Sequence, residues 1–483
     1  MRLLRIECEL LCLIATVAGV YLTRVSCPSL RGEESRRARV AIEMMETGDW
    51  AVPRQQSEPY FDRPPLQNWA IALAARVTGD VGSVAIRLPS VLAVLCTSLL
   101  VYGYAHTFLG RLGALAAGVA FATMGQVLEL GRLGETEALF TLLVSASLML
   151  WHLGYIRGWP AGAVWIMGYG LAALGALTKG PQAPLYFAGS VWLYLLLNKD
   201  WRYLLSWRHA AGAAAFVAGL GWWQLAYVRE VGWSGAREIW FGEVGMRFAD
   251  ARAASVASHL AGFPLEVLVC MLPWSALLLC YAAPSLRAGL GKARRFVWFL
   301  SLCFLVAFLT CWLPPLARPR YLMPVYPAVA VLIGVVVDRA GASVPDAFAA
   351  WMWQHFVRVL ACGMLICGAG VLAVSFAPTP GTLALAQPPG FALAYALGGV
   401  GTAAIMWRTV CRGGGRAHAA QIIAVAFFLG LTYTGVVVNA LVNTSIDTEG
   451  AVAQLKRQLP AGYRLVSLGP IHHLFAYYTA AHN

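Results

Sequence analysis

Long apolar runs separated by short polar gaps dominate the chain. Residues 91–104 and 422–442 contain no charged side chain, and runs of this length are typical of helices that cross a membrane. The third and fourth runs are the least regular, because acidic and basic residues interrupt residues 129–137. The pattern predicts an all-α polytopic membrane protein with about 13 transmembrane helices, near residues 10–25, 88–108, 112–127, 139–155, 163–177, 183–197, 210–227, 263–281, 296–313, 323–337, 360–376, 391–407 and 422–442.

Composition excludes a soluble enzyme of this length. Apolar residues make up 59% of the 483 residues and charged residues only 12%, about half of the roughly 25% usual in soluble domains. The net charge of +13 has two candidate explanations, nucleic acid and the cytoplasmic side of a membrane.

The positions of the basic residues distinguish these explanations. Most lysines and arginines lie in short gaps between the apolar runs, and these gaps share one side of the membrane if the N-terminus is cytoplasmic. A nucleic-acid site would instead cluster its charge on one domain, with aromatic residues between the charges. We therefore expect no nucleic-acid partner, a cytoplasmic N-terminus and an extracytoplasmic C-terminus. The gaps lie near residues 2–5, 111, 157, 199–208, 287–295 and 408–416.

Two long segments interrupt the bundle pattern, at about residues 27–87 and 228–262. Both mix aromatic and charged residues, which is typical of helices lying in the membrane–water interface. Loops of this length in a compact protein are usually functional, so the outside face is where chemistry is expected. The predicted organisation is a transmembrane domain over residues 1–442 and a small extracytoplasmic segment over residues 443–483.

Acidic residues of the outside segments are the first candidates for chemistry. Glu33 and Glu34 begin a helical pattern just after the first run, where they could serve as a general base or a metal site. The alternative is that acidic residues simply stabilise the first turn of a helix. Charge is costly in the apolar region between the third and fourth runs, and this favours a functional cavity over an ordinary polar loop; the charged residues there are Glu129, Arg132, Glu135 and Glu137. Asp62 and Arg63 lie in a proline-rich turn, where a structural salt bridge explains them equally well.

Cations are the second group of candidates. Lys179 ends the fifth predicted helix, and Arg320 precedes the tenth. Each could complement a helix dipole or extend toward the interface, and each could hold a lipid phosphate. Outside acids together with outside cations indicate a site for a phosphorylated lipid.

The combined motifs resemble a known family, the bacterial C-type membrane glycosyltransferases of the protein O-mannosyltransferase and lipid A aminoarabinose transferase superfamily. The resemblance runs from about residue 24 to residue 327 and is most specific in the first loop. It is carried by Glu33-Glu34-Ser35-Arg36, Glu43-Met44, Gly48-Asp49-Trp50, Pro53-Arg54, Tyr60-Phe61-Asp62-Arg63-Pro64-Pro65, Trp69, Leu177-Thr178-Lys179-Gly180, Pro273-Trp274 and Arg320-Tyr321-Leu322-Met323-Pro324.

The resemblance implies a function at the outer face of the bacterial inner membrane. The family transfers a sugar from a polyprenyl-phosphate donor, such as undecaprenyl phosphate, to a lipid, glycan or protein acceptor, and inversion at the anomeric carbon is expected. Lipid A modification is one example. Membrane lipids are the surroundings, and a divalent metal is the only cofactor that the resemblance suggests.

The family's site residues transfer to matching positions. The resemblance gives catalytic roles to Glu33, Glu34 and Glu137. It gives donor-phosphate binding to Arg63, Lys179, Arg320 and Tyr321. Asp62 and His259 are the candidate metal ligands, although the spacing of His259 differs from the family pattern.

Three departures from the family keep other functions open. Glutamate replaces the usual aspartate at positions 33 and 137, and arginine replaces lysine at position 63. An added methylene displaces a carboxylate by roughly an ångström, which matters for positioned acid–base chemistry. A family member that binds polyprenyl lipids without catalysis therefore stays an alternative. A lipid or solute transporter is another, although the paired broken-helix repeats typical of transporters are not evident in the sequence.

Overall fold

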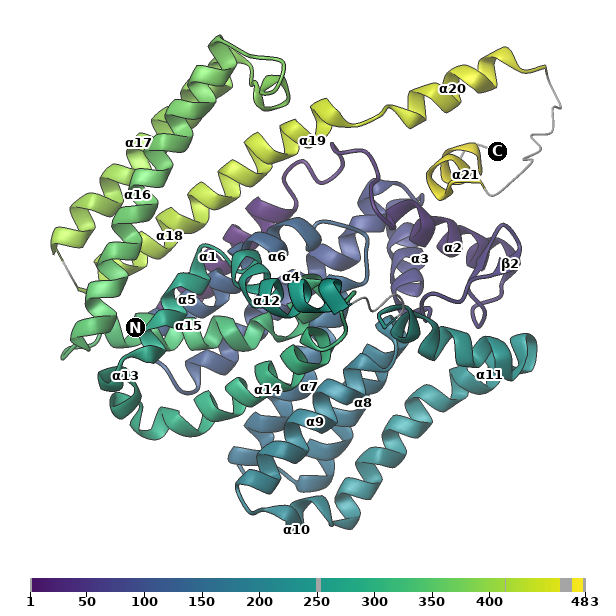
Figure 1. The fold of residues 1–483 in the computed structure, drawn as a ribbon, viewed down its shortest axis with the longest axis horizontal. Helices are drawn as coiled ribbons and strands as arrows, with labels where there is room; N and C mark the ends of the chain where they lie inside the picture. Colours follow the sequence, from purple (N-terminus) through teal and green to yellow (C-terminus); the bar gives the residue numbers. More distant parts are fainter. Residues whose placement is uncertain (1, 249–252, 413, 461–470, 481–483) are drawn as a thin grey trace.

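Helices form nearly all of the regular structure in the computed structural model, which describes residues 2–248, 253–412, 414–460 and 471–480 (Figure 1). The elements of the first half are α1 (Arg2–Tyr21), α2 (Glu34–Thr47), β1 (Arg54–Gln55), β2 (Glu58–Pro59), α3 (Leu66–Thr78), α4 (Ser83–His106), α5 (Arg111–Thr123), α6 (Gly125–Leu130), α7 (Glu137–Ile156), α8 (Ala161–Lys179), α9 (Gln182–Leu197), α10 (Trp201–Leu204) and α11 (Trp207–Met246). Those of the second half are α12 (Ala253–Cys270), η1 (Trp274–Ala282), α13 (Pro284–Gly289), η2 (Gly291–Ala293), α14 (Arg294–Trp312), η3 (Pro319–Val325), α15 (Tyr326–Ala340), α16 (Ala347–Phe376), η4 (Leu383–Leu385), α17 (Pro389–Arg412), α18 (Gly415–Leu431), the π-helical turn η5 (Thr432–Val437), α19 (Val438–Thr444), α20 (Thr448–Gln458) and α21 (His473–Ala480).

The chain is a multi-pass membrane protein, and its predicted all-α fold class is confirmed. The only strands in the described residues are β1 and β2, a two-residue antiparallel pair. Nine helices of the described residues are long and apolar enough to cross a membrane, or ten if a bent pair counts as one span. Three further apolar helices, at residues 8–21, 111–123 and 182–197, are shorter. Each of the 13 predicted runs is therefore helical, but the number of spans is not confirmed as 13.

Two predicted spans differ from straight helices for local reasons. The eighth is the bent pair, in which residues 255–270 and 274–282 meet at 116°. Pro273 lies between the two halves and cannot continue the helical hydrogen-bond ladder. The third, predicted over residues 112–127, is interrupted at Met124, whose extended backbone separates α5 from the short helix α6.

Helix α15 forms the centre of the core. Nearly all of its side chains are buried, and it packs against α5, α14 and α16. Close contact with α5 depends on small residues: a Cβ added at Gly334 would lie 2.5 Å from the carbonyl oxygen of Gly113. Small residues at such positions allow membrane helices to approach closely, and this packing fixes η3, which leads directly into α15.

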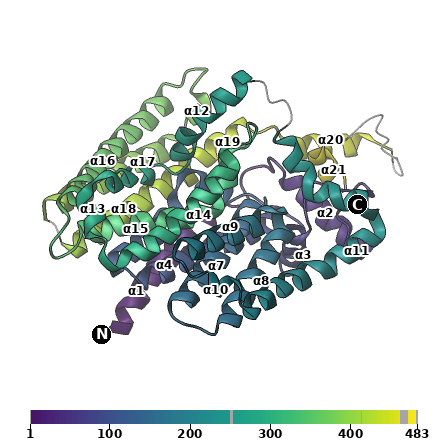
Figure 2. The same ribbon diagram turned by 60° about the horizontal axis from the view of Figure 1, so that its bottom comes forward.

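One end of the molecule gathers the segments between the membrane helices, and we call it the loop end. It contains α2, α3, the β1–β2 hairpin, α20 and α21, which lie together in Figure 1 and in the turned view of Figure 2. Ala38 and Ala41 of α2, Ile71 of α3, Val452 of α20 and Tyr477 of α21 share one apolar cluster. The predicted boundary at residue 443 is not tested, but the C-terminal helices share a core with the first loop.

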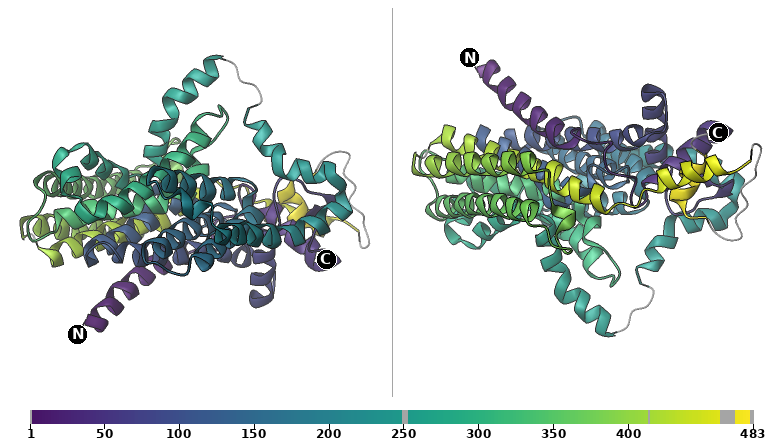
Figure 3. Two further views of the ribbon diagram at one scale, coloured as in Figure 1. Left: turned by 90° about the horizontal axis from the view of Figure 1, so that it is seen from below. Right: turned by 90° about the horizontal axis from the view of Figure 1, so that it is seen from above.

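The second predicted loop, residues 228–262, is largely helical. Helix α11 continues to Met246, with a break at Gly232, whose φ of 72° lies in the left-handed region that glycine tolerates best. Beyond the break, Ala236 and Ile239 pack against Val52 and Leu177. Figure 3 shows α12 and the N-terminal part of α1 projecting from opposite faces of the molecule.

Candidate functional site

A polar pocket of about 100 Å³ lies at the loop end. It is formed by the start of α2, the turn before α3, the loop between α6 and α7, and η3. Five residues predicted from the sequence line it together, although they are far apart in the chain. The lining residues are Glu33, Arg36, Arg37, Tyr60, Asp62, Arg63, Glu135, Thr136, Glu137 and Arg320.

Glu33 and Asp62 share one cation at the rim of this pocket. Nη1 of Arg36 lies 3.0 Å from Oε2 of Glu33 and 3.2 Å from Oδ2 of Asp62. The side chain of Glu33 is about one-third exposed (34%), so it is the predicted catalytic acid with the most open access to solvent. Because Glu33 is the N-cap of α2, its position is set by the helix that begins there.

Glu135 and Glu137 are buried and are held by Arg320. Nη1 of Arg320 lies 3.1 Å from Oε2 of Glu135, and its Nε lies 3.4 Å from Oε1 of Glu137. Burial raises the pKa of Glu135, and the nearby Glu137 raises it further, while Arg320 opposes both effects. The backbone N–H of Glu33 donates to Oε1 of Glu135 over 3.3 Å, which joins the two acidic segments.

Lys179 lies beneath the pocket and does not line it. Its Nζ donates to Oε1 of Glu137 over 2.8 Å, and both side chains are almost fully buried. The ring of Tyr321 lies close to three cations: Nζ of Lys179 is 4.9 Å from the ring centroid, and the guanidinium carbons of Arg247 and Arg320 are 4.3 Å and 5.9 Å from it. These distances are typical of cation–π contacts. The result is a concentration of positive charge beside the carboxylates.

Glu34 has a different environment from its neighbour Glu33. It is fully buried, and Arg87 binds both of its carboxylate oxygens, with Nε at 2.7 Å and Nη2 at 2.8 Å. The backbone N–H groups of Gly134 and Arg31 donate to the same two oxygens. Adjacent residues in a helix point about 100° apart, so only Glu33 faces the pocket. The predicted catalytic role of Glu34 stays a prediction, and its contacts favour a positioning role.

The metal prediction finds little support in the geometry. Asp62 lies beside Arg36, and Nε2 of His259 lies 3.4 Å from the carbonyl oxygen of Cys311 in the region of α12 and α14. In the part of the chain that the structure describes, no group of three or more His, Cys, Asp or Glu residues could hold a metal ion. The role of Asp62 and His259 as metal ligands stays a prediction, and we derive no step through a metal.

Five pocket residues, Arg36, Arg37, Tyr60, Glu135 and Thr136, were not assigned a role from the sequence. Arg36 and Tyr60 belong to motifs that carry the family resemblance, but the resemblance gave them no role; Arg37 and Thr136 lie in no such motif and also suit an ordinary helix or turn. Nε and Nη1 of the buried Arg37 have no hydrogen-bond partner among the described residues. Glu135 was part of a recognised charged interruption, and its spacing of two residues from Glu137 was the available signal.

Arg247, whose guanidinium contacts the ring of Tyr321, is not among the site residues predicted from the sequence. No sequence signal pairs it with η3, because the packing that brings the two together is long-range.

Parts of the chain are similar to known proteins. The family described as dolichyl-phosphate-mannose-protein mannosyltransferase matches residues 62–223. An undecaprenyl phosphate-alpha-4-amino-4-deoxy-L-arabinose arabinosyl transferase from Pseudomonas aeruginosa (strain LESB58) is 31% identical over 306 residues, covering 62% of this chain and 54% of the relative. A protein of the same name from Edwardsiella ictaluri is 27% identical over 313 residues, covering 64% and 55%. The chain thus spans about half the length of the curated relatives it matches.

Solved structures show the same fold. The crystal structure of ArnT from Cupriavidus metallidurans bound to undecaprenyl phosphate superposes with a TM-score of 0.72 at 20% identity, covering 97% of this chain and 84% of that one. The apo structure of the same protein gives a TM-score of 0.73 at 18% identity. At this identity the likeness concerns the fold.

Proposed function

We propose that this chain, which belongs to the membrane glycosyltransferase superfamily of the protein O-mannosyltransferases and aminoarabinose transferases, transfers a sugar from a polyprenyl-phosphate donor to an acceptor at the extracytoplasmic face of the bacterial inner membrane. The N-terminus is then cytoplasmic and the loop end extracytoplasmic. This orientation leaves the cation-rich gaps on the cytoplasmic side.

One observation carries the proposal: the side chain of Arg320 spans Glu135 and Glu137 while lying against Tyr321, beside Lys179 and Arg247. A phosphate monoester or diester fits such a group of cations, because guanidinium groups present several N–H donors to phosphate oxygens. The buried carboxylates hold these cations in place before the phosphate arrives.

The proposed reaction is a direct displacement. An acceptor hydroxyl oxygen attacks the anomeric carbon of the sugar, a new C–O bond forms, and the bond from that carbon to the phosphate oxygen breaks. The electron pair of the broken bond stays on the leaving polyprenyl phosphate, where fixed cations stabilise the added charge. The proton of the hydroxyl passes to the carboxylate of Glu33, the most accessible of the predicted acids.

The pocket residues then have distinct roles. Arg320, Arg63 and Arg247 hold the donor phosphate, and Tyr321 supports the cations around its ring. Glu137 positions Lys179 and Arg320, with which it forms ion pairs of 2.8 Å and 3.4 Å.

The names of the relatives suggest the first donor to test, undecaprenyl phosphate-α-4-amino-4-deoxy-L-arabinose. We propose a glycolipid acceptor of the lipid A type, with glycan and protein hydroxyls as the alternatives. Mass spectrometry of envelope lipids and glycans from a deletion strain would identify both substrates, because the acceptor loses one sugar while the lipid-linked donor accumulates.

The test is transfer by the purified full-length protein in proteoliposomes. Glu33→Gln should lower kcat by roughly 10²–10⁴-fold, the usual contribution of general acid–base catalysis, and leave donor binding unchanged. Glu46→Gln is the matched control, since it removes an exposed carboxylate (58%) from the same helix. Arg320→Gln should weaken donor binding itself. Wild-type rates in Glu33→Gln would refute the assignment of the base.

The glutamates at positions 33 and 137 favour a second candidate, a protein that binds polyprenyl-phosphate sugars without transferring them. The same preparation distinguishes the two functions. Saturable donor binding with no product from any acceptor in the panel would support the second candidate and overturn the first.

A further inference from the structure

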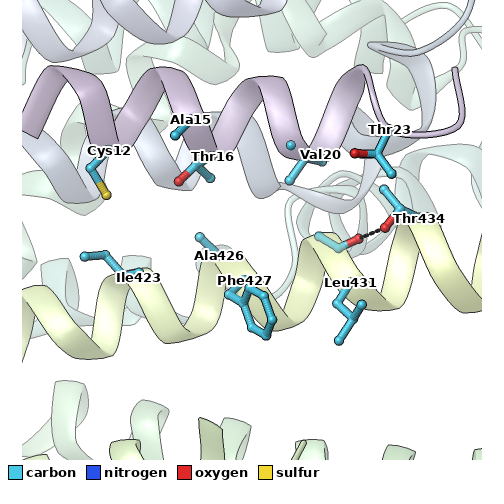
Figure 4. A pocket seen from close by; sticks show the side chains of 12 residues that line it. Cys12, Ala15, Thr16, Val20, Thr23, Ile423, Ala426, Phe427, Leu431 and Thr434 are labelled. Carbon is cyan, nitrogen blue, oxygen red and sulfur yellow. Dashed lines mark hydrogen bonds between the residues drawn. The ribbon is translucent and has the colours of Figure 1, made fainter. Parts of the chain in front are cut away.

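A second cavity lies between helices α1 and α18 (Figure 4). Its volume of about 480 Å³ is in the range of small-molecule sites. Ala15, Val20, Ala426 and Leu431 give it a mainly apolar lining. In Figure 4, Cys12 and Thr16 of α1 and Ala426 of α18 lie toward the space between the two helices. We call it the α1–α18 groove.

The groove reaches about one leaflet deep. Its lining runs from Cys12 on α1 to Thr23 in the turn that follows, and a helical rise of 1.5 Å per residue gives about 14 Å from Cys12 to the end of the helix. This is roughly half of the ~30 Å hydrocarbon thickness of a bilayer. On α18 the exposed side chain of Phe427 forms part of the wall, so the groove is accessible from the lipid side.

Positive charge is concentrated where the groove meets the loop end. The guanidinium of Arg132 donates to the carbonyl oxygens of Val20 and Thr23, the latter over 2.6 Å. Nη1 of Arg24 donates to the carbonyl oxygen of Thr434 over 3.2 Å. Arg31 and Arg132 both lie beside Tyr433.

These arginines share the region with one acidic residue, Glu129, whose charge acts on Tyr433 together with those of Arg31 and Arg132. Across the described ranges, no carboxylate forms an ion pair with Arg24, Arg31 or Arg132 at 4.0 Å or less. Burial lowers the pKa of Arg132, and the positive charges of Arg87 and Arg24 lower it further, while Tyr433 and Tyr21 oppose them. An anion bound here would compensate this excess of positive charge.

The same segments form the groove and the polar pocket. Arg132 contacts the end of α1, and three residues later Glu135 accepts a hydrogen bond from the backbone N–H of Glu33. The π-helical turn η5 (Thr432–Val437) forms the opposite wall at this end, and such turns are frequent at functional sites. A headgroup at the end of the groove therefore lies beside the walls of the proposed transfer site.

We propose that the α1–α18 groove holds one hydrocarbon chain of the phosphorylated acceptor lipid, whose headgroup phosphate lies at Arg24 and Arg31. This inference rests on the proposed function, since it assigns the acceptor route of the same site. The donor phosphate is held by the separate cations around Tyr321, so the two lipids approach from different sides.

A groove-filling variant tests the hydrocarbon part. A Cβ at Gly19 meets no atom within 4 Å, so Gly19→Phe places a ring in the groove without a backbone clash. Gly103→Phe is the control: it lies on the membrane helix α4, its Cβ is equally unobstructed, and it does not line the groove. We expect Gly19→Phe to raise the acceptor KM at least tenfold with kcat and the donor KM within twofold. Gly103→Phe should change none of the three.

Direct binding is measured without turnover, which separates this inference from the proposed function. The probe is lipid A with a photoactivatable acyl chain, in phosphatidylethanolamine vesicles. Cross-links should fall on peptides of α1 and α18 and be lost in Gly19→Phe. Cross-links there without sugar transfer would leave the groove assignment standing and overturn the proposed function. Cross-links elsewhere, or an unchanged acceptor KM in an active Gly19→Phe protein, would overturn the groove assignment.

The headgroup part is tested with Arg24→Gln. The wild type should prefer phosphorylated lipid A over its dephosphorylated form, and Arg24→Gln should reduce that preference several-fold. Arg76→Gln removes an exposed arginine at the end of α3 and should leave the preference unchanged. Equal labelling by both lipids in the wild type would refute the phosphate assignment.

Discussion

The ion pair of Glu34 and Arg87 provides the sharpest test of how the candidate site is built. Both side chains are almost fully buried, at 0% and 2% exposure, and they form two hydrogen bonds of 2.7 Å and 2.8 Å. Arg87 also donates to three backbone carbonyls of the chain between α1 and α2. Removing either partner therefore leaves an uncompensated buried charge and releases the segment that leads into Glu33.

The expected cost follows from this geometry. Breaking a buried ion pair by removing one partner costs about 3–5 kcal/mol, or roughly two to nearly four powers of ten in the folding equilibrium. Glu34→Gln and Arg87→Met should each lower the free energy of unfolding by about that amount. The double variant should cost less than the sum of the two, because neither charge is then left alone; coupling between such neighbours is typically about 0.5–3 kcal/mol.

Denaturant unfolding in mixed micelles, followed by tryptophan fluorescence, measures the four free energies of this cycle. Sugar transfer by the folded fraction is measured in parallel. A positioning role predicts large losses of stability with transfer per folded molecule reduced only a few-fold. If Glu34→Gln keeps the wild-type free energy of unfolding but abolishes transfer, the positioning role is wrong and the catalytic role predicted from the sequence is favoured.

Three further perturbations test other parts of the site. Because burial and Glu137 raise the pKa of Glu135 above its ordinary 4.5, the folded protein binds an extra proton in the window above 4.5, and stability falls as pH rises through it. Glu135→Gln should remove that fall, as unfolding measured from pH 4.5 to 8 would show; an unchanged slope contradicts the assignment. Tyr321→Phe should keep donor affinity within about twofold, whereas Tyr321→Leu removes the ring that faces three cations and should weaken donor binding several-fold in a lipid-binding assay; equal effects would argue against a cation–π role. A Cβ at Gly134 would lie 2.2 Å from Cγ2 of Ile86, so Gly134→Ala should lower the free energy of unfolding by about 1–3 kcal/mol, and a neutral result in denaturant unfolding would show that the α6–α7 loop can yield.

The sequence predicted the helices better than their relation to the membrane. Runs of apolar residues over 15 to 20 positions dictate helices, because a backbone in hydrocarbon must satisfy its own hydrogen bonds. The length of an apolar run is a weaker guide to whether the helix crosses the membrane. Helices α5 and α9 are short, and α11 continues for 40 residues through the break at Gly232. The sharp bend near Pro273 comes from the proline between the two half-helices, and an average of hydropathy over a run does not register a single proline.

The sequence predicted which residues belong to the site better than it predicted which of their side chains contact one another. Motif order placed Glu33, Glu137 and Arg320 at one face, and the structure brings them to one pocket. The sequence could not separate Glu33 from Glu34, since the difference is the direction in which each side chain leaves the helix. It could not connect Arg247 to Tyr321 either, because 74 residues of chain separate them and only the packed fold brings them together.

The internal counter-ions of the polar pocket have a consequence for the turnover cycle. Under the proposed function, an incoming phosphate must share Arg320 with Glu135 and Glu137, so binding is an exchange of one anion for another and the gain in affinity is modest. After transfer the exchange is reversed: Glu135 and Glu137 again pair with the guanidinium of Arg320, and the polyprenyl phosphate dissociates. A site lined by arginines alone would bind its most negatively charged product, polyprenyl phosphate, tightly. In this pocket the two carboxylates compete with that product for Arg320 and so favour its release.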